Sequence, residues 1–373
     1  MNQPLHTSKR GSAWLVGLLA ALTIATAACS SDSKTTTSSG SSSSSSASGA
    51  PAYDYASLSG TLNGSGSSFQ DSFDQKAITD FKAVAPKVAV TYTKSGSGAG
   101  KTDLQGAVVQ FAGTDSIIKD EDKAKYKGDV LYFPTVGAPI TVAFNVSGVS
   151  KLQLSADVVA GIFGGTITTW NDQKIGADNA GVTLPPTPIV VVHRSDASGT
   201  TSNFTKFLKK AAPSVWTLDS GDTVNWPATT QGAEKNSGVA SVVSGTNGAV
   251  GYVDLADAAS AKLATAAIKN SAGKFVEGKL PGAAAALKGA TVKDDLTYDP
   301  IGAAGDDAYP ITSPTWIIAY AAQPDKATAD ALKGFLNFIL TDGQKQANAV
   351  GYAPLPTDLA TKAIAQLSKI TGG

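Results

Sequence analysis

The segment that decides the fold is "KVAVTYTKSGSGAGKTDLQGAVVQF", residues 87–111. It opens as a strand, because apolar side chains alternate at Val88, Val90 and Tyr92. A Ser/Gly loop follows, and from Lys101 the chain shows a helical pattern. A strand, a glycine-rich loop and a helix in this order predict an α/β unit. The backbone N–H groups of such a loop and of the helix N-terminus can bind an anion.

The "GKT" at residues 100–102 suggests a nucleotide-binding P-loop, but the full pattern is not met. G-x-x-x-x-G-K-[ST] requires a glycine five residues before Gly100, where this chain has Ser95. We expect Lys101 to lie in the first turns of the helix, where its side chain is either solvated or adds to the positive electrostatic field at the loop. The sequence therefore predicts an anion-binding loop rather than a nucleotide site.

The N-terminus has the pattern of a secretory signal. Lys9 and Arg10 precede the apolar run "AWLVGLLAALTIATAA", which is short for a membrane span. Cys29 follows directly and is the only cysteine of the chain, so it has no disulfide partner. We predict a lipoprotein signal peptide over residues 1–28 and a lipid anchor on Cys29; a freely secreted protein is the alternative.

The segment that follows is rich in serine. Residues 30–51 contain no hydrophobic side chain larger than alanine and cannot bury enough apolar surface to order themselves. We predict that residues 29–52 comprise the lipidated cysteine and a disordered tether, which places the rest of the chain outside the cytoplasm.

The remaining residues, from about 53 to 373, predict an α/β protein. At about 320 residues this part is too long for one ordinary core, so we expect two lobes. Strand-like runs such as "TPIVVVH" and "SPTWIIAYAA" alternate with helical runs such as "SADVVAGIFGG" and a long one over residues 326–350. The formal net charge is zero, which indicates neither nucleic acid nor an anionic membrane face as a partner.

Few residues are suited to catalysis. Beyond the signal, His193 is the only histidine, and the adjacent Arg194 would oppose the imidazolium of a Ser/His/Asp triad. We expect His193 to be a structural residue. A zinc site would need clustered His, Cys and carboxylate ligands, which the sequence does not show, so we expect no metal and no catalytic residue.

Three loops of serine, glycine and threonine follow strands or open helices. In "TLNGSGSSFQDSF" Ser68 stands where a helix N-cap is expected, and in the segment quoted first the loop contains Ser97. In "VVVHRSDASGTTSNFTKFL" a strand leads through Arg194 to a helix that begins near Ser198. Ordinary helix capping explains each loop alone. Their recurrence beside Arg194, whose planar donors suit a tetrahedral oxyanion, favours an anion site.

Taken together, these motifs resemble the phosphate-binding protein of the bacterial high-affinity phosphate ABC importer, the PstS family. The resemblance covers the globular region in order, and its most specific part is the R-x-D-x-S-G-T pattern of residues 194–200. It is carried by "GSGSSF", "YTKSGSGAG", "FAGTDSII", "GIFGGTITTWND", "HRSDASGT", "GAVGYVD", "YPITSPTW" and "GYAPLP".

The resemblance implies a two-lobed periplasmic-binding-protein fold of type II, with a hinge and a central ligand cleft. One lobe would comprise residues 53–138 plus 306–373 and the other residues 139–305. The implied partners are inorganic phosphate and the membrane permease subunits of the transporter, reached from a lipid-anchored position on the outer face of the cytoplasmic membrane. No cofactor is implied.

Carried over motif by motif, the resemblance also implies the ligand contacts. Asp115 matches an acceptor carboxylate, and Asp196 would orient Arg194 rather than touch the ligand. Ser68 stands where the family has threonine and Gln70 where it has proline, so we expect a similar contact from a less rigid loop. The phosphate ligands would be Ser68, Phe69, Ser97, Asp115, Arg194, Ser198, Gly199 and Thr200.

Other functions remain open at this stage. A binder of sulfate, molybdate or polyphosphate ends could use similar donors, and so could a secreted phosphoester hydrolase. A surface adhesin or a structural lipoprotein would not need the Arg/Ser/Thr constellation. Hydrolysis would require a nucleophile with a base, or metal ligands, and the sequence shows neither.

Overall fold

The computed structural model describes residues 53–373, which form one compact unit. The predicted signal peptide (1–28), the lipidation site Cys29 and the tether (29–52) lie outside the described residues. Within the described part, no helix is both long enough and apolar enough to cross a membrane.

The unit is built on a nine-stranded mixed sheet with the strand order β2-β1-β3-β12-β4-β8-β6-β7, in which β9 also pairs with β4. A smaller sheet has the order β11-β10-β5, and β13 pairs with β14. The strands are β1 Gly60–Gly66, β2 Val88–Thr93, β3 Phe111–Thr114, β4 Val130–Asn145, β5 Gln153–Leu154, β6 Val190–Arg194, β7 Gln231–Ala233, β8 Ala249–Asp254, β9 Ala264–Thr265, β10 Ala267–Lys269, β11 Phe275–Val276, β12 Thr312–Tyr320, β13 Ala322–Gln323 and β14 Thr371–Gly372.

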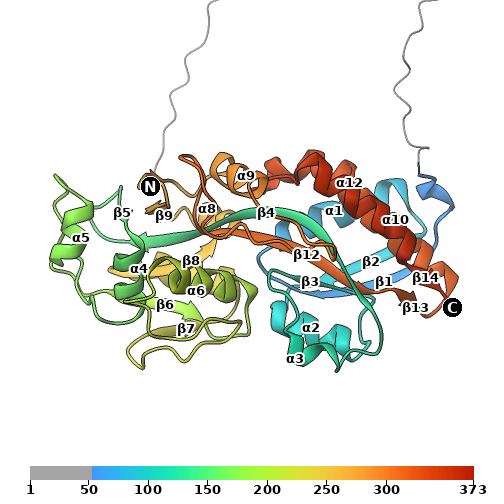
Figure 1. Ribbon diagram of the computed structural model, residues 1–373, viewed down its shortest axis with the longest axis horizontal. Coiled ribbons are helices and arrows are strands. Elements are labelled where there is room, and N and C mark those ends of the chain that lie inside the picture. Colours follow the sequence, from blue (N-terminus) through green and yellow to red (C-terminus); the bar gives the residue numbers. More distant parts are fainter. Residues whose placement is uncertain (1–52) are drawn as a thin grey trace, which may run out of the picture. The chain divides into compact units, whose positions relative to one another are not determined.

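Helices cover both halves of this sheet (Figure 1). The α-helices are α1 Asp71–Val84, α2 Ser97–Gln105, α3 Asp120–Lys123, α4 Ala156–Phe163, α5 Gln173–Asp178, α6 Gly199–Ala211, α7 Lys235–Gly245, α8 Leu255–Ser260, α9 Leu280–Lys288, α10 Lys326–Leu340, α11 Asp342–Gln346 and α12 Thr357–Gln366. Short 3₁₀ helices are η1 Tyr55–Ser57, η2 Ala347–Val350 and η3 Leu367–Lys369. The α/β expectation is confirmed.

The long strand β4 joins the two halves. Its residues 130–139 pair with β12, and its residues 140–145 pair with β8. In Figure 1 β4 and β12 run between one helix group that contains α2 and α10 and another that contains α4 and α6. The change of pairing partner lies beside the lobe boundary proposed at residues 138 and 139, and the boundaries themselves stay a prediction.

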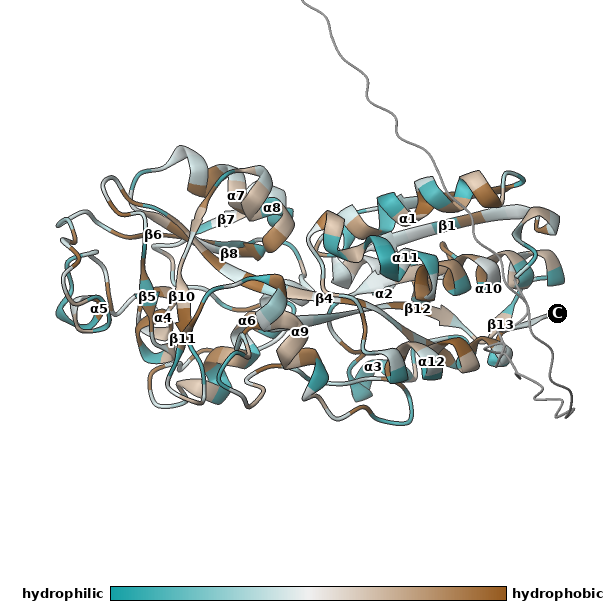
Figure 2. Cartoon of the chain, turned by 90° about the horizontal axis from the view of Figure 1, so that it is seen from above, coloured by the Kyte–Doolittle hydropathy of each residue, from teal (hydrophilic) through white to brown (hydrophobic). Residues whose placement is uncertain are grey.

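Each half has its own aromatic packing. Phe111, Phe335 and Phe81 pack together on the side of α1 and α10, while Phe204 stacks on Tyr252 beside α6. The helices α1, α10 and α12 carry both hydrophilic and hydrophobic stretches (Figure 2), and their buried residues face the interior. Burial of these apolar faces is the main stabilising term for both halves.

Three local expectations differ from the structure. The helix expected from Lys101 begins at Ser97, because the glycines of the loop continue directly into helical backbone. The N-cap of α1 is Gln70 rather than Ser68. The helical run at 326–350 breaks at Thr341, whose hydroxyl donates back to the Asn337 carbonyl at 2.7 Å.

Candidate functional site

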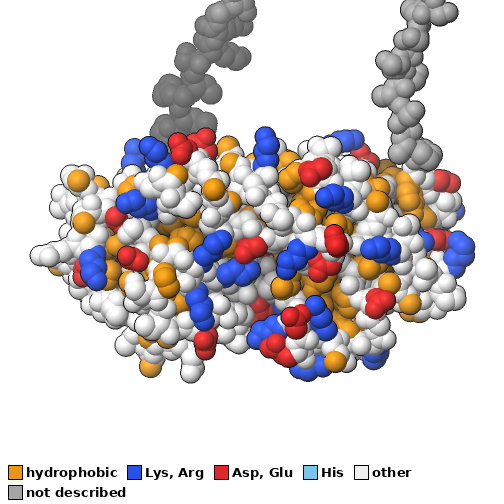
Figure 3. Space-filling view, in the orientation of Figure 1, with side chains coloured by type: hydrophobic (Ala, Val, Ile, Leu, Met, Phe, Trp, Pro, Cys, Tyr) orange, Lys and Arg blue, Asp and Glu red, His pale blue; other side chains and the backbone are white. Residues whose placement is uncertain are grey.

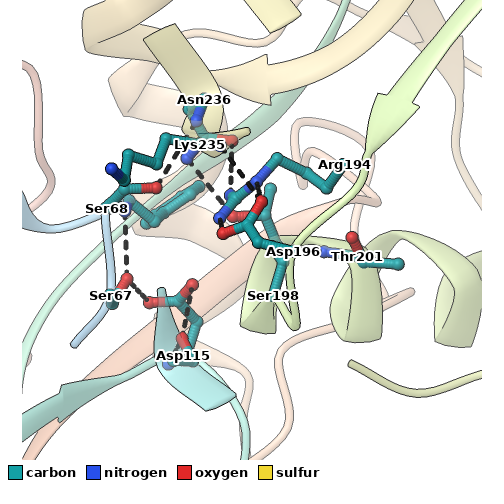
Figure 4. A network of polar contacts seen from close by, with 12 residues as sticks. Ser67, Ser68, Asp115, Arg194, Asp196, Ser198, Thr201, Lys235 and Asn236 are labelled. Carbon is teal, nitrogen blue, oxygen red and sulfur yellow. Dashed lines mark hydrogen bonds and ion pairs between the residues drawn. The ribbon is translucent and has the colours of Figure 1, made fainter. Parts of the chain in front are cut away.

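Four loops meet at the carboxyl ends of strands from the two halves of the sheet. They follow β1, β2, β3 and β6, which are parallel within each half. Ligand sites in open α/β sheets form outside such strand ends. Figure 4 shows Ser67, Ser68 and Asp115 facing Arg194, Asp196 and Asn236 across this meeting point.

Arg194 is the buried cation of the site, with only 3% of its surface exposed. Its Nε donates to Asp196 Oδ1 at 2.7 Å, and its Nη2 is paired with Asp196 Oδ2. Its Nη1 donates to Asn236 Oδ1 at 3.3 Å. Asp196 also accepts the Lys235 N–H at 3.0 Å, and the pKa of its carboxyl is lowered although burial opposes the shift. Arg194 is therefore held from two sides inside the protein, not in a surface ion pair.

This clamp leaves part of the guanidinium free. A guanidinium has five N–H donors, and the three contacts above use three of them. The remaining two N–H groups, one on each terminal nitrogen, have no acceptor among residues 53–373. Two adjacent donors of this kind bind an oxyanion in a bidentate manner.

Asp115 is the buried carboxylate opposite, with 2% of its surface exposed. Its Oδ1 accepts from the Ser67 hydroxyl and its Oδ2 from the Ser97 hydroxyl at 3.4 Å. Burial raises the pKa of Asp115 to about 7, although the hydrogen bond from Ser67 and the charge of Arg194 act in the opposite direction. This carboxyl group therefore changes its charge near neutral pH.

The loop of residues 67–69 is fixed through its carbonyl groups. The Tyr92 hydroxyl donates to the Ser67 carbonyl at 2.8 Å, and the Tyr352 hydroxyl donates to the Phe69 carbonyl at 2.7 Å. The Phe69 side chain is fully buried, and its N–H donates to Ser67 Oγ at 3.0 Å. The "GYAPLP" motif thus contributes a tyrosine that positions the first loop.

Two helix N-termini approach each other at the site. α2 begins at Ser97 and α6 at Gly199, and the Ser198 hydroxyl caps α6 by accepting the Thr201 N–H at 3.2 Å. A Cβ atom on Gly199 would lie 2.7 Å from Ser97 Oγ and 2.7 Å from the Cβ of Asp115. The first N–H groups of a helix have no intrahelical acceptor and carry partial positive charge, so both ends favour an anion.

The structure brings together all the residues that the sequence analysis named for the site. Thr200 is fully buried, and its Oγ1 accepts from the Asn236 Nδ2 at 3.3 Å. Two further residues belong to the cluster and were missed. Ser67, next to Ser68 in the first loop, donates to Asp115, while the Asn236 N–H donates to Ser68 Oγ at 3.4 Å. Ser67 is visible in "GSGSSF", whereas nothing in the sequence marks Asn236.

His193 makes packing and polar contacts next to Arg194. Its ring stacks on Trp226 with ring centroids 4.9 Å apart, and its Nδ1 lies 3.0 Å from the Arg194 carbonyl oxygen. Burial lowers its pKa. Among residues 53–373 there is no group of three or more His, Cys, Asp or Glu side chains arranged to hold a metal ion.

Comparison with known proteins places this site in a family. Residues 30–343 match the model of the PBP superfamily domain. The chain is 33% identical over 313 residues to phosphate-binding protein PstS 3 of Mycobacterium leprae, covering 81% of this chain and 85% of the relative. It is 36% identical over 313 residues to the phosphate-binding protein PstS of Methanocaldococcus jannaschii, covering 77% and 80%.

The chain belongs to the PstS family of phosphate-binding proteins.

Solved structures of similar proteins agree with this family fold. A high-affinity periplasmic phosphate-binding protein, solved with phosphate bound, matches with a TM-score of 0.68 at 24% identity, covering 82% of this chain and 94% of that chain. A phosphate-binding protein from Stenotrophomonas maltophilia matches with a TM-score of 0.65 at 21% identity, covering 82% and 93%. The expected α/β, two-lobed type II periplasmic-binding-protein fold is confirmed.

Proposed function

We propose that this protein is an extracytoplasmic solute-binding protein that captures inorganic phosphate between its lobes and delivers it to an ABC importer. The lobes would be residues 53–138 plus 306–373 and residues 139–305. The observation that carries the proposal is the buried pair of Arg194, with two free N–H groups, and Asp115, an acceptor on the opposite side. The family's named relatives are phosphate-binding proteins, which supports the same ligand.

The chemistry of this pair fits a tetrahedral oxyanion that still carries a proton. Arg194 and the N-termini of α2 and α6 supply donors to phosphate oxygens. An ionised Asp115 can only accept, so it requires a P–OH group on the ligand. The ligand set proposed here adds Ser67 and Asn236 as positioning residues to Ser68, Phe69, Ser97, Asp115, Arg194, Ser198, Gly199 and Thr200, with Asp196 orienting Arg194.

Equilibrium dialysis of the purified mature protein against radiolabelled phosphate tests the proposal. We expect one tight site per chain, displaced by arsenate and not by sulfate at equal ionic strength. In parallel, p-nitrophenyl phosphate should be left intact, because the named relatives of this chain are phosphate-binding proteins. Tighter binding of sulfate or molybdate than of phosphate would contradict the proposed ligand, and turnover of the ester would contradict a pure binding function.

Gly199→Ala is expected to weaken phosphate binding by about tenfold or more, because the added methyl group collides with Asp115 and Ser97 when the two sides close. Calorimetric titration with phosphate measures the effect. Gly245→Ala is the matched control, since nothing lies within 4 Å of its Cβ position. Equal affinities of the two variants would show that the close approach at Gly199 is absent from the phosphate-bound form.

We also propose that the protein is anchored to the outer face of the cytoplasmic membrane. The signal peptide would be residues 1–28, and Cys29 would carry the lipid at the start of a tether that ends at residue 52. The permease subunits of a phosphate ABC transporter would then lie within reach of the tethered lobes.

Cys29→Ser is expected to release the protein from the membrane into the medium, because an acyl anchor needs that thiol. Fractionation of cells that express the full chain, followed by immunoblotting, measures the change. Ser30→Ala serves as the control and should stay membrane-bound. A Cys29→Ser protein that resists washing of the membranes would exclude the lipid anchor.

A further inference from the structure

A cavity of about 490 Å³ lies next to the proposed phosphate site. Asp115 and Ser116 belong to its lining and Arg194 does not, so the cavity and the site share Asp115. Its volume lies in the range of small-molecule pockets and exceeds what one phosphate ion needs. We call it the lysine cavity, after the five lysines that line it: Lys101, Lys119, Lys206, Lys210 and Lys293.

Two of these lysines are already engaged. The Lys101 Nζ donates to Asp222 Oδ2 at 2.7 Å and to Ser116 Oγ at 2.9 Å. The Lys210 Nζ donates to the Ile301 carbonyl at 2.7 Å. The lysine of the "GKT" sequence is thus neutralised by Asp222, whereas Lys210 donates to a neutral carbonyl and keeps its positive charge.

The other three lysines are weakly compensated. The Lys206 Nζ lies 3.9 Å from Asp299, and the Lys119 Nζ lies 3.7 Å from the exposed Glu121. The side chain of Lys293 makes no hydrogen bond or ion pair with any residue from 53 to 373. The lining therefore holds five lysines against the three carboxylates of Asp115, Asp222 and Asp299. Outside the lining, Asp120 and Asp295 interact with the charge of Lys293, and Asp122 with that of Lys119, which reduces the excess positive charge.

Tyr298 also lines the lysine cavity, with 5% of its surface exposed. Its hydroxyl has no hydrogen-bond partner among the described residues, but the oxygen is itself buried and adds no accessible donor to the cavity. In Figure 3 lysine side chains, interspersed with Asp and Glu, lie around the middle of the face, where the region of α6 meets that of α2 and α3.

We propose that the lysine cavity is a second, weaker oxyanion site, in which a phosphate ion binds before it passes Asp115 into the inner site. The inference rests on the proposed function, because an ion held in the lysine cavity would move on to the phosphate site formed by Arg194 and Asp115, which we call the inner site. Lysine ammonium groups act as point charges without a fixed geometry, so the outer site accepts sulfate as well as phosphate. It therefore differs from the inner site in both affinity and selectivity.

The test uses the mature protein with its inner site saturated by unlabelled phosphate. Radiolabelled sulfate is then titrated at low salt. Because the inner site excludes sulfate, the bound label measures binding to the outer site alone. We expect one weak sulfate site per chain, weakened about threefold to tenfold in the double variant Lys206→Met/Lys293→Met.

The matched control is Lys174→Met/Lys362→Met, which removes the same net charge from exposed positions on α5 and α12, outside the cavity. The same lysine-cavity double variant should slow phosphate association at low salt, and the difference should vanish near 1 M salt, where the screening length falls to about 3 Å. No saturable sulfate site in the phosphate-loaded protein, or equal loss in the control variant, would overturn the inference.

The variant Arg194→Ala distinguishes failure of the proposed function from failure of this inference. In Arg194→Ala protein the outer site should persist and should still respond to Lys206→Met/Lys293→Met. Tight sulfate binding that disappears with Arg194→Ala would instead show that the inner site binds sulfate. That result would contradict the proposed ligand, and the difference in selectivity between the two sites would no longer hold.

Discussion

Arg194→Ala is expected to weaken phosphate binding by about tenfold to a hundredfold, because each hydrogen bond to a charged group contributes about 1.5–3 kcal/mol. In the proposed site, the two free N–H groups of Arg194 are the charged donors to the ligand. Among residues 53–373, Lys235 joins this cluster only through its backbone N–H, which Asp196 accepts. Calorimetric titration with phosphate measures the loss. An unchanged affinity would remove Arg194 from the site.

The neighbours of Arg194 allow a finer test of the same prediction. Asp196→Asn keeps the size of the side chain but removes the charge that holds Nε and Nη2. In the proposed site Asp196 orients the guanidinium and does not contact the ligand, so we expect a smaller loss than in Arg194→Ala. Arg194→Lys keeps the charge but lacks the planar pair of donors and should not restore full affinity. Restoration by lysine would show that charge alone binds the ligand.

Asp115→Asn is expected to abolish most of the discrimination against sulfate. In the proposed site, ionised Asp115 would face a sulfate oxygen with no proton between the two oxygens. A buried unsatisfied group costs at least about 1–3 kcal/mol, and a charged one costs more. The wild-type protein should therefore prefer phosphate over sulfate by more than about a hundredfold. An asparagine can turn its NH₂ group toward the ligand and tolerate sulfate. Competition of sulfate against labelled phosphate on both proteins measures this difference. Comparable sulfate binding by wild type, or equal exclusion by the variant, would show that Asp115 is not the selector.

The same residue predicts how selectivity depends on pH. The pKa of Asp115 is raised to about 7, chiefly by burial, so the carboxyl is mostly ionised at pH 8 and mostly protonated at pH 6. A protonated carboxyl can donate to a sulfate oxygen, whereas dihydrogen phosphate can still pair with it. Sulfate should therefore compete better as the pH falls from 8 to 6, while phosphate binding persists. In Asp115→Asn the sulfate affinity should not change over this interval, which is the control for other titrating groups.

Local patterns in the sequence were sufficient to predict the elements and the residue types of the site. The alternation of apolar side chains over residues 88–93 predicted β2. The Ser198-Gly199 sequence after a strand predicted the start of α6. Both are short-range features, because strand periodicity and helix capping depend on neighbours within a few positions. The long helical run predicted over residues 326–350 is interrupted at Thr341, whose backbone leaves the helical conformation with φ −118° and ψ −85°.

By itself, then, the sequence determined an α/β protein whose glycine-rich loops suit an anion and stand beside the motif of Arg194. Only the tertiary structure decided which donors remain free on Arg194, that Asn236 completes its clamp 42 positions further along the chain, and that Lys101 is neutralised by Asp222. It also decided the pKa of Asp115, because burial between two halves of the sheet cannot be deduced from the residue type. These properties depend on contacts between loops that follow β1, β3 and β6, and such long-range contacts leave no periodic signal in the sequence.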